Sequence, residues 1–197
     1  MESALITGTS KGLGRGLADA LASANWQVYG CSRSGCDLPN VTDRRCDLAD
    51  HDSLPGLLRE LLAPVDHLDL VVLNAGVLGA IEDLTNSSLS ALQKVMDINL
   101  WSNKVIMDWL SVWGKPVEQI VMISSGASIL GNRGWSGYAL SKAALNMLAK
   151  LYAHEFSKTH ISALAPGIID TSMMNHLCEE ADAARFPALT RLRQARG

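Results

Sequence analysis

The chain has 197 residues, a formal net charge of −3 and a sequence pI near 5.9. Its lysines and arginines are scattered rather than massed in one segment, which argues against nucleic acid as a partner. No apolar stretch reaches the roughly 18 residues that a membrane span requires, and no basic leader precedes an apolar run. We therefore expect a cytoplasmic protein without membrane contact, folded as a single domain over 1–197.

Cysteine and histidine usage gives no sign of disulfides or of a metal. The four cysteines, at positions 31, 36, 46 and 178, contain no CxxC pair. Without a secretory signal, reduced thiols are expected. The five histidines form neither an HExxH motif nor a close pair. We expect no catalytic metal.

Short runs rich in Val, Ile and Leu alternate with longer segments of helical period, a pattern typical of a parallel sheet with helices on both faces. The expected strands are 3–7, 27–32, 44–47, 68–73, 119–124 and 160–165. The expected helices are 15–24, 51–62, 88–113 and 138–157. Right-handed crossovers then predict an α/β fold, a Rossmann-type doubly wound sheet of about six strands in the order 3-2-1-4-5-6. The connection 33–43 is too short for a helix, so one crossover helix is expected to be absent.

A glycine-rich turn joins the first expected strand to the first expected helix, with the sequence TGTSKGLG at 7–14. Gly8, Gly12 and Gly14 have no Cβ, so the backbone can approach a pyrophosphate closely. The unpaired amides at the helix start favour negative charge. This pattern predicts a dinucleotide phosphate site, with a plain turn as the alternative.

Tyr138 and Lys142 are four residues apart in an expected helix, so their side chains share one face. The ammonium is expected to lower the pKa of the phenol from about 10 toward neutrality, which suits a group that exchanges a proton. Ser125 lies thirteen residues earlier, at the end of an expected strand, where its hydroxyl could hold a substrate oxygen. Ser124 is the competing choice, and an ordinary half-exposed pair is the alternative for Tyr138 and Lys142.

These motifs occur together in one order. TGTSKGLG resembles the TGxxxGxG of the short-chain dehydrogenase/reductase family, and NAG at 74–76, the Ser125 and YALSK set, and PG at 166–167 resemble that family's later motifs. The resemblance implies an NADPH-dependent oxidoreductase that reduces a ketone, aldehyde or diketone to an alcohol by hydride transfer, with Tyr138 as proton donor. GW at 134–135 is similar to sepiapterin-reductase-like and benzil-reductase-like members, which suggests a conjugated ketone or diketone. A non-catalytic dinucleotide-binding or sensing relative is the alternative.

The resemblance also assigns individual residues. Asn99, Ser125, Tyr138 and Lys142 take the catalytic positions, with Asn99 supporting a water-linked proton path to the lysine and Lys142 also holding the nicotinamide ribose. The positions implied to contact NADP(H) are Gly8, Ser10, Lys11, Gly12, Leu13, Gly14, Ser32, Arg33, Asp47, Leu48, Asn74, Ala75, Gly76, Tyr138, Lys142, Pro166, Gly167, Ile169 and Thr171.

NADPH is expected in preference to NADH. An NAD-selective site usually ends its second strand with an acid that bonds the ribose hydroxyls. Here that strand runs into Ser32 and Arg33, and Lys11 is in the glycine turn. Two cations and a hydroxyl suit a 2'-phosphate. A surface arginine on a loop is the alternative.

The segment after Gly167 departs from the family pattern, which usually continues to a seventh strand. Only thirty residues follow Gly167, so either the member is compact or a C-terminal segment is missing. We expect no seventh strand and interpret 168–197 as a substrate lid, ordered by the cofactor, and a tail; a permanently packed helix is the alternative. Acidic and then basic residues predict a polar tail helix that ends at Gly197. The resemblance also implies a homodimer through the 88–113 and 138–157 helices, although burial within one subunit explains the same apolar positions.

Overall fold

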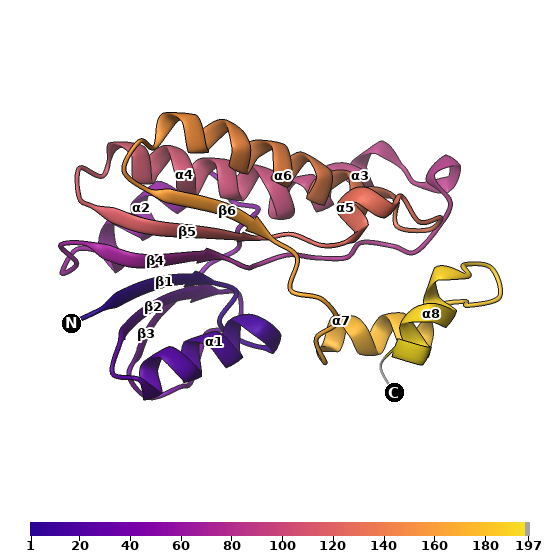
Figure 1. Cartoon of the computed structure of the whole chain (residues 1–197), viewed down its shortest axis with the longest axis horizontal. Coiled ribbons are helices and arrows are strands. Elements are labelled where there is room, and N and C mark those ends of the chain that lie inside the picture. The colour runs from indigo at the N-terminus through magenta and orange to yellow at the C-terminus, as the bar shows by residue number, and fades with distance from the viewer. Residues whose placement is uncertain (196–197) are drawn as a thin grey trace.

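A computed structural model of the chain describes residues 1–195, which contain one six-stranded parallel sheet (Figure 1). The strand order is β3-β2-β1-β4-β5-β6, which confirms the predicted doubly wound topology. No seventh strand occurs within these residues. The strands are β1 (Ser3–Thr7), β2 (Gln27–Ser32), β3 (Val41–Arg45), β4 (Leu68–Leu73), β5 (Val117–Ile123) and β6 (His160–Leu164).

Helices cover both faces of the sheet. Figure 1 shows α2, α4 and α6 over one face, α1 over the other, and α7 and α8 beyond the carboxyl ends of the strands. The α-helices are α1 (Gly12–Ser23), α2 (Leu54–Leu61), α3 (Leu89–Met96), α4 (Ser102–Val112), α5 (Ala127–Leu130), α6 (Ser136–Glu155), α7 (Ser172–Asn175) and α8 (Ala188–Ala195). A 3-10 turn, η1 (Leu84–Asn86), and two π-helical turns, η2 (Asp97–Trp101) and η3 (His176–Glu180), complete the description.

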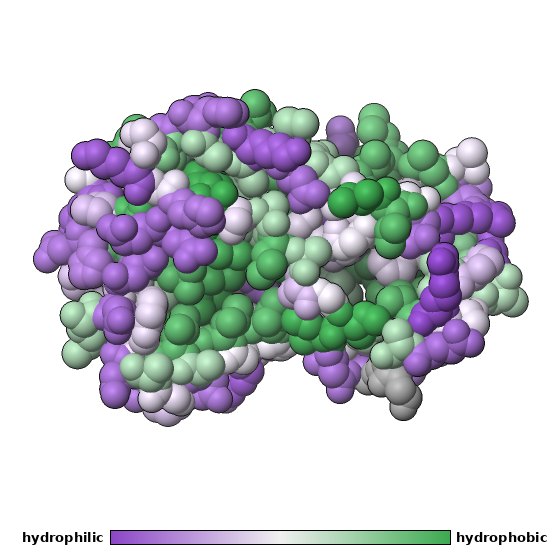
Figure 2. Space-filling view, in the orientation of Figure 1, coloured by the Kyte–Doolittle hydropathy of each residue, from purple (hydrophilic) through white to green (hydrophobic). Residues whose placement is uncertain are grey.

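The central strands send alternate side chains to opposite faces, as the period of two requires. Leu5 and Val71 belong to the large core under α2, α4 and α6, whereas Ile6 and Val72 pack toward α1. All five residues of β1 are buried, because this strand lies between β2 and β4 with helices on both sides. Figure 2 shows apolar side chains gathered between α1 and the α7–α8 segment on the face in view.

Several expected boundaries were wrong. The first helix starts at Gly12 rather than at 15, and the fifth strand starts at Val117 rather than at 119. β3 is 41–45 rather than 44–47, because this edge strand is polar and only Val41 marks its buried side. The second helix starts at Leu54 rather than at 51, with Pro55 in its first turn, where a missing amide proton costs little. The expected 88–113 helix is divided by η2, which the apolar spacing does not reveal. No helix forms between β2 and β3, as expected.

The start of α1 approaches the end of β1 so closely that no side chain fits between them. A Cβ at Gly14 would lie 2.4 Å from both the Gly8 carbonyl oxygen and Asn74 Nδ2. Asn74 in turn donates from Nδ2 to the Thr7 carbonyl oxygen at 2.9 Å. Glycine at 14 therefore lets α1, β1 and the residues after β4 meet at one point.

We predict that Gly14→Ala lowers the free energy of unfolding by roughly 1–3 kcal/mol, because the added methyl group has no space. Gly16→Ala is the matched control in the same helix, since a Cβ there meets nothing within 4 Å. It should be neutral or stabilise by up to about 1 kcal/mol, the helix-propensity gain. Chemical denaturation measures both; equal effects would show that the Gly14 contact is not restrictive.

Candidate active site

A cavity of about 800 Å³ opens at the carboxyl ends of the central strands. All positions predicted to contact the cofactor line this cavity except Gly14, and all predicted catalytic positions line it except Asn99. Residues from the glycine turn, the ends of β2, β4 and β5, the start of α6 and the segment after β6 thus meet at one place. The carboxyl edge of an open α/β sheet is where such folds bind ligands.

The glycine-rich turn is braced by the NAG segment. The Thr7 hydroxyl oxygen accepts hydrogen bonds from the backbone amides of Asn74 at 3.0 Å and Ala75 at 3.1 Å. Gly8 and Gly12 have φ angles of 80° and 58°, in the left-handed region that favours glycine. The turn thereby presents bare backbone to the cavity, which is what close contact with a diphosphate requires.

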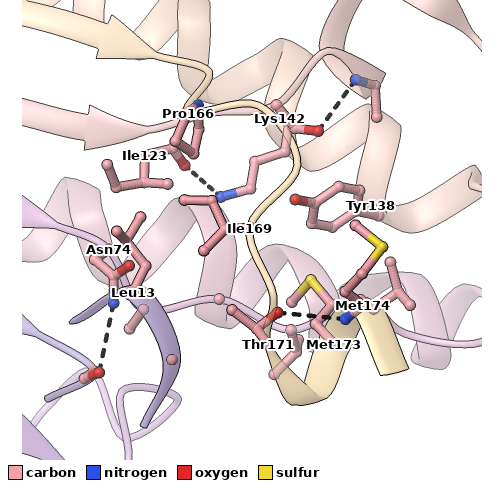
Figure 3. Close-up of a pocket in the computed structure, with 18 of the residues that line it drawn as sticks. Leu13, Asn74, Ile123, Tyr138, Lys142, Pro166, Ile169, Thr171, Met173 and Met174 are labelled. Atoms are coloured by element: carbon pink, nitrogen blue, oxygen red, sulfur yellow. Dashed lines mark hydrogen bonds between the residues drawn. The ribbon is translucent and has the colours of Figure 1, made fainter. Parts of the chain in front are cut away.

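Tyr138 and Lys142 lie together on one wall of the cavity (Figure 3), and Ser125 lines the same cavity. Figure 3 shows the Tyr138 hydroxyl and the Lys142 amine both pointing toward Ile169. Lys142 Nζ lies 5.7 Å from the centroid of the Tyr138 ring and donates to the Ile123 carbonyl oxygen at 2.6 Å.

The two neighbouring serines have different partners. The Ser124 hydroxyl donates to Asn146 Oδ1 at 2.6 Å and is buried. The Ser125 hydroxyl lines the cavity with Tyr138 and acts to lower the pKa of its phenol. This geometry favours Ser125, rather than Ser124, as the serine that acts beside Tyr138.

The expected lowering of the Tyr138 pKa is not found in this structure. Burial raises the pKa of the phenol, and the Ser125 hydroxyl opposes this only in part. Lys142 is desolvated as well, which lowers the pKa of its amine to about 8. Tyr138 is therefore held in its protonated form, and Lys142 loses its proton at a lower pH than an ordinary lysine does.

Asn99 lies behind the cavity rather than in its wall. Its side chain is fully buried in the π-helical turn η2; Oδ1 accepts from the Val77 amide at 2.8 Å, and Nδ2 donates to the Val77 carbonyl oxygen at 2.9 Å. A Cβ at Gly76 would lie 3.2 Å from Asn99 Oδ1 and 3.6 Å from Lys142 Nζ. Asn99 thus fixes the chain beside the Lys142 amine.

The end of the cavity next to β2 suits the adenosine half of a dinucleotide. Ser32 Oγ is buried and has no hydrogen-bond partner among the described residues. Arg33 and Lys11 are exposed side chains on the same part of the cavity wall. An orphaned hydroxyl and two cations beside a glycine turn fit a nucleotide phosphate group.

Sequence reasoning missed Asp43, a strand residue that holds this end of the site together. Its carboxylate accepts from the Thr9 hydroxyl and from the Cys36 amide, the latter at 3.1 Å. A Cβ at Gly30 would lie 2.8 Å from Asp43 Oδ1, so the carboxylate packs directly on β2. Because the third strand was expected to start at 44, Asp43 was assigned to the loop before it.

The segment after β6 folds back over the site. A Cβ at Gly12 would lie 3.2 Å from Thr171 Cγ2, so Thr171 lies against the glycine turn. Its hydroxyl oxygen accepts from the Met174 amide at 3.3 Å and caps α7 (Figure 3). Ile168, Met173 and Met174 line the cavity.

The tail contains a largely exposed helix, as expected, but this helix is shorter than predicted. Residues 181–187 are irregular, and α8 is short and packs Leu189 fully buried against a cluster that includes Trp135 and Tyr138. The predicted helix end at Gly197 lies outside the described residues. Among the charged residues of the tail, Phe186 and Leu189 are buried in this cluster and Leu192 packs against it.

An ion-pair cluster that the sequence did not indicate fastens this segment. The Asp83 carboxylate accepts from Arg133 Nη2 and Arg185 Nη2, both at 2.9 Å. Both guanidinium groups lower the pKa of Asp83. Both also lie over the ring of Phe186, at 6.0 and 5.3 Å from its centroid. The residues before α6 and before α8 are thereby joined to the loop after β4.

Residues 1–195 contain no helix long and apolar enough to cross a membrane. The same residues contain no cluster of three or more His, Cys, Asp or Glu side chains arranged to hold a metal ion.

Comparison with known proteins identifies the family. The family model for short chain dehydrogenase matches residues 2–182. An uncharacterised oxidoreductase of Saccharomyces cerevisiae is 30% identical over 93% of this chain and 77% of its own length. Its crystal structure matches with a TM-score of 0.86 at 27% identity, over 99% of this chain and 83% of that one.

Two further relatives are named by activity or ligand. An (S)-benzoin-forming benzil reductase of Saccharomyces cerevisiae is 31% identical over 89% of this chain and 74% of its own length. A short chain dehydrogenase structure from Shigella flexneri, complexed with NADP, has a TM-score of 0.80 at 21% identity, over 98% of this chain and 90% of that one. With the matching fold and motifs, these comparisons show that the chain belongs to the short-chain dehydrogenases, oxidoreductases that use NAD(P).

We predict that Lys142 makes folding stability depend on pH between about 8 and 10.5. The unfolded amine keeps its ordinary pKa of 10.5, whereas burial lowers the folded value to about 8, so the unfolded chain binds the extra proton in this window. Burial of Lys142 therefore costs no stability above pH 10.5, where the amine is neutral in both states. The free energy of unfolding falls as the pH drops from 10.5 to 8, and the loss is complete below pH 8.

Denaturation of the parent and of Lys142→Met at pH 7 and pH 10 tests this. The parent should gain roughly 2–3 kcal/mol more than the variant over that interval, at 1.36 kcal/mol per pKa unit. Contributions from other groups cancel in the comparison. Parallel pH profiles would mean that Lys142 titrates normally.

Proposed function

We propose that this protein is an NADPH-dependent carbonyl reductase that converts a ketone, aldehyde or diketone to an alcohol. The observation that carries the proposal is the meeting of Ser125, Tyr138 and Lys142 in one cavity with a glycine-rich turn. The similarity to a benzil reductase supports carbonyl reduction, and the related fold with bound NADP supports the cofactor.

In this mechanism the chain positions the carbonyl group and supplies the proton. The bound nicotinamide supplies hydride chemistry. Ser125 holds the substrate oxygen, and the Tyr138 hydroxyl donates its proton to that oxygen as charge develops there. The raised pKa of Tyr138 supports this direction, because the protonated phenol is the form that reduction consumes.

The apolar part of the cavity suits a conjugated ketone or diketone. Trp135 is buried beside Tyr138, with ring centroids 6.3 Å apart. Leu78 and Leu177 line the same side of the cavity, and Met173 and Met174 belong to the segment that lies over it. A flat substrate would bury against these side chains and displace water from the Tyr138 hydroxyl.

We predict that Tyr138→Phe lowers carbonyl reduction by roughly 10²- to 10⁴-fold, the loss expected when a positioned proton donor is removed. NADPH affinity should stay within a few-fold of the parent, because the ring remains in place. Tyr152→Phe is the control on the same helix, since that hydroxyl bonds to Asp108 away from the cavity.

The measurement is NADPH consumption with a panel of aldehydes, ketones and diketones, together with NADPH binding followed by fluorescence. Near-parent activity in Tyr138→Phe would assign the proton to another group. Binding without turnover across the panel would instead support the alternative function, a non-catalytic dinucleotide sensor.

We predict that Arg33→Asp abolishes or inverts the preference for NADPH over NADH, because a carboxylate repels a 2'-phosphate and accepts bonds from ribose hydroxyls. Arg44→Asp is the matched control; Arg44 is also exposed but does not line the cavity. The ratio of kcat/KM for the two cofactors checks this. The same ratio in parent and Arg33→Asp would remove Arg33 from cofactor selection.

We also propose that two copies associate through the 88–113 and 138–157 segments. Leu140, Met147 and Leu151 on α6 are each more than half exposed and lie on one face, at spacings of seven and four. Trp101, in η2, is exposed as well. Covering these side chains in a dimer removes apolar surface from water.

We further propose that the segment 168–178 is a lid that becomes ordered when the nucleotide binds. Thr171 already contacts Gly12, so a diphosphate seated on the glycine turn would lie against this threonine. Each added contact offsets conformational entropy that the segment loses on closing.

A further inference from the structure

Two cysteines lie side by side at the end of the cavity that suits adenosine. Cys31 is the fifth residue of β2 and is fully buried; Cys46 follows directly after β3 and is partly exposed. Both line the cavity, next to Ser32, Asp47 and Leu48. The mechanism of carbonyl reduction uses neither thiol.

The strand register places the two thiols on the same side of the sheet. Ser32 pairs with Arg45, and the Cys46 amide donates to the Ser32 carbonyl oxygen at 3.0 Å. Cys31 precedes Ser32, and Cys46 follows Arg45. Because side chains alternate along both strands, both cysteines lie on the face of the sheet opposite to the side chains of Ser32 and Arg45. Cys46 packs against the core cluster that contains Cys31, both residues line the same cavity, and each thiol shifts the pKa of the other.

We propose that Cys46 is a peroxide-sensitive modification site that bound dinucleotide shields, and that Cys31 captures the oxidised sulfur as a disulfide. Peroxide oxidises the Cys46 thiol to a sulfenic acid and is reduced to water. The Cys31 thiol then attacks that sulfur; the S–O bond breaks, the S–S bond forms and a second water leaves. The shielding rests on the proposed NADP(H) site, whereas the oxidation itself does not.

Exposure and the mutual influence of the thiols assign the two roles. The Cys31 thiol lowers the pKa of Cys46, whereas the Cys46 thiol and burial raise the pKa of Cys31, so Cys46 carries the greater thiolate character. Burial and the carboxylates of Asp43 and Asp47 oppose the shift at Cys46. Cys46 is also the thiol with access to the cavity from solvent, whereas Cys31 has no exposed surface.

The position of Cys46 permits the second step. It lies beyond the last residue of β3, and β3 is an edge strand that pairs only with β2 among the described strands. A diagonal pair across neighbouring strands needs the two backbones to draw together before a disulfide closes. An edge strand is paired on one side only, so its end opens with a smaller loss of hydrogen bonds than a central strand does. Such a shift displaces Asp47 and Leu48, which are predicted nucleotide contacts.

The remaining cysteines serve as internal controls. Cys178 donates its thiol hydrogen to Met174 Sδ at 3.6 Å, and Cys36 lies in the loop between β2 and β3. Both are partly exposed, as Cys46 is, so exposure alone predicts similar oxidation at the three positions. Preferential oxidation of Cys46 would therefore report its surroundings.

The test treats the full chain with equimolar hydrogen peroxide, blocks the free thiols by alkylation and maps the product by mass spectrometry. We expect a Cys31–Cys46 disulfide, with loss of two hydrogens, before Cys36 or Cys178 reacts. In Cys31→Ser the Cys46 sulfenic acid should accumulate and be trapped by dimedone. Cys178→Ser should behave as the parent does.

Because Cys31 is a core residue, its variant could lose stability, so Cys46→Ser provides the second variant. Cys46→Ser should lose the disulfide while keeping the parent's thermal unfolding temperature within a few degrees.

Nucleotide protection is measured on the same protein. With NADP⁺ at about ten times its measured Kd, oxidation of Cys46 should slow about tenfold, because only the free protein reacts. Equal reactivity of the three partly exposed cysteines, absence of the disulfide, or unchanged oxidation rates at saturating NADP⁺ would each overturn the proposal. A failure of NADP⁺ to bind at all, seen in the separate Kd measurement, would instead reject the proposed cofactor site and leave the oxidation result to be judged alone.

Discussion

The contact between the start of α1 and the end of β1 is the constraint on which the site depends. Gly14, Gly8 and Asn74 meet at distances that exclude any side chain at position 14. This approach directs the amide groups of the glycine turn at the cavity and fixes the NAG segment against Thr7. The phosphate end and the reactive end of the cavity are thereby held in one frame, since β4 and β5 are neighbours in the sheet.

A second constraint is the burial of two ionisable groups side by side. Tyr138 and Lys142 are both removed from water, and each is driven toward its neutral form. Such an arrangement lowers stability compared with an apolar pair, so it persists where function requires it. Ser125 and the Ile123 carbonyl oxygen are the polar partners that make the arrangement tolerable.

The sequence was sufficient to locate the central strands. Consecutive apolar residues such as Leu5 and Ile6, or Val71 and Val72, point to opposite faces of a strand and so indicate that both faces are buried. It was also sufficient to place most predicted cofactor contacts around one cavity, since glycines and strand ends have fixed geometry. It failed at β3, where an exposed edge strand carries charged residues and Asp43 acts through contacts with Thr9 and Cys36 that are distant in sequence. The raised pKa of Tyr138 was missed for a similar reason: it comes from burial of the phenol, which the spacing of Tyr138 and Lys142 does not encode.

The C-terminal segment is held by the apolar cluster around Leu189 and by polar or close contacts at two further points. Thr171 lies against Gly12 at one end, and Arg185 shares Asp83 with Arg133 at the other. A segment held at both of these places would open by moving outward between them rather than by rotating about one end. One of its attachments is a set of exposed charges, which dissolved ions screen within about 10 Å at 0.1 M salt. We therefore expect ionic strength to affect the entry of small molecules beneath this segment, through the charges that hold Arg185 and Arg133 to Asp83.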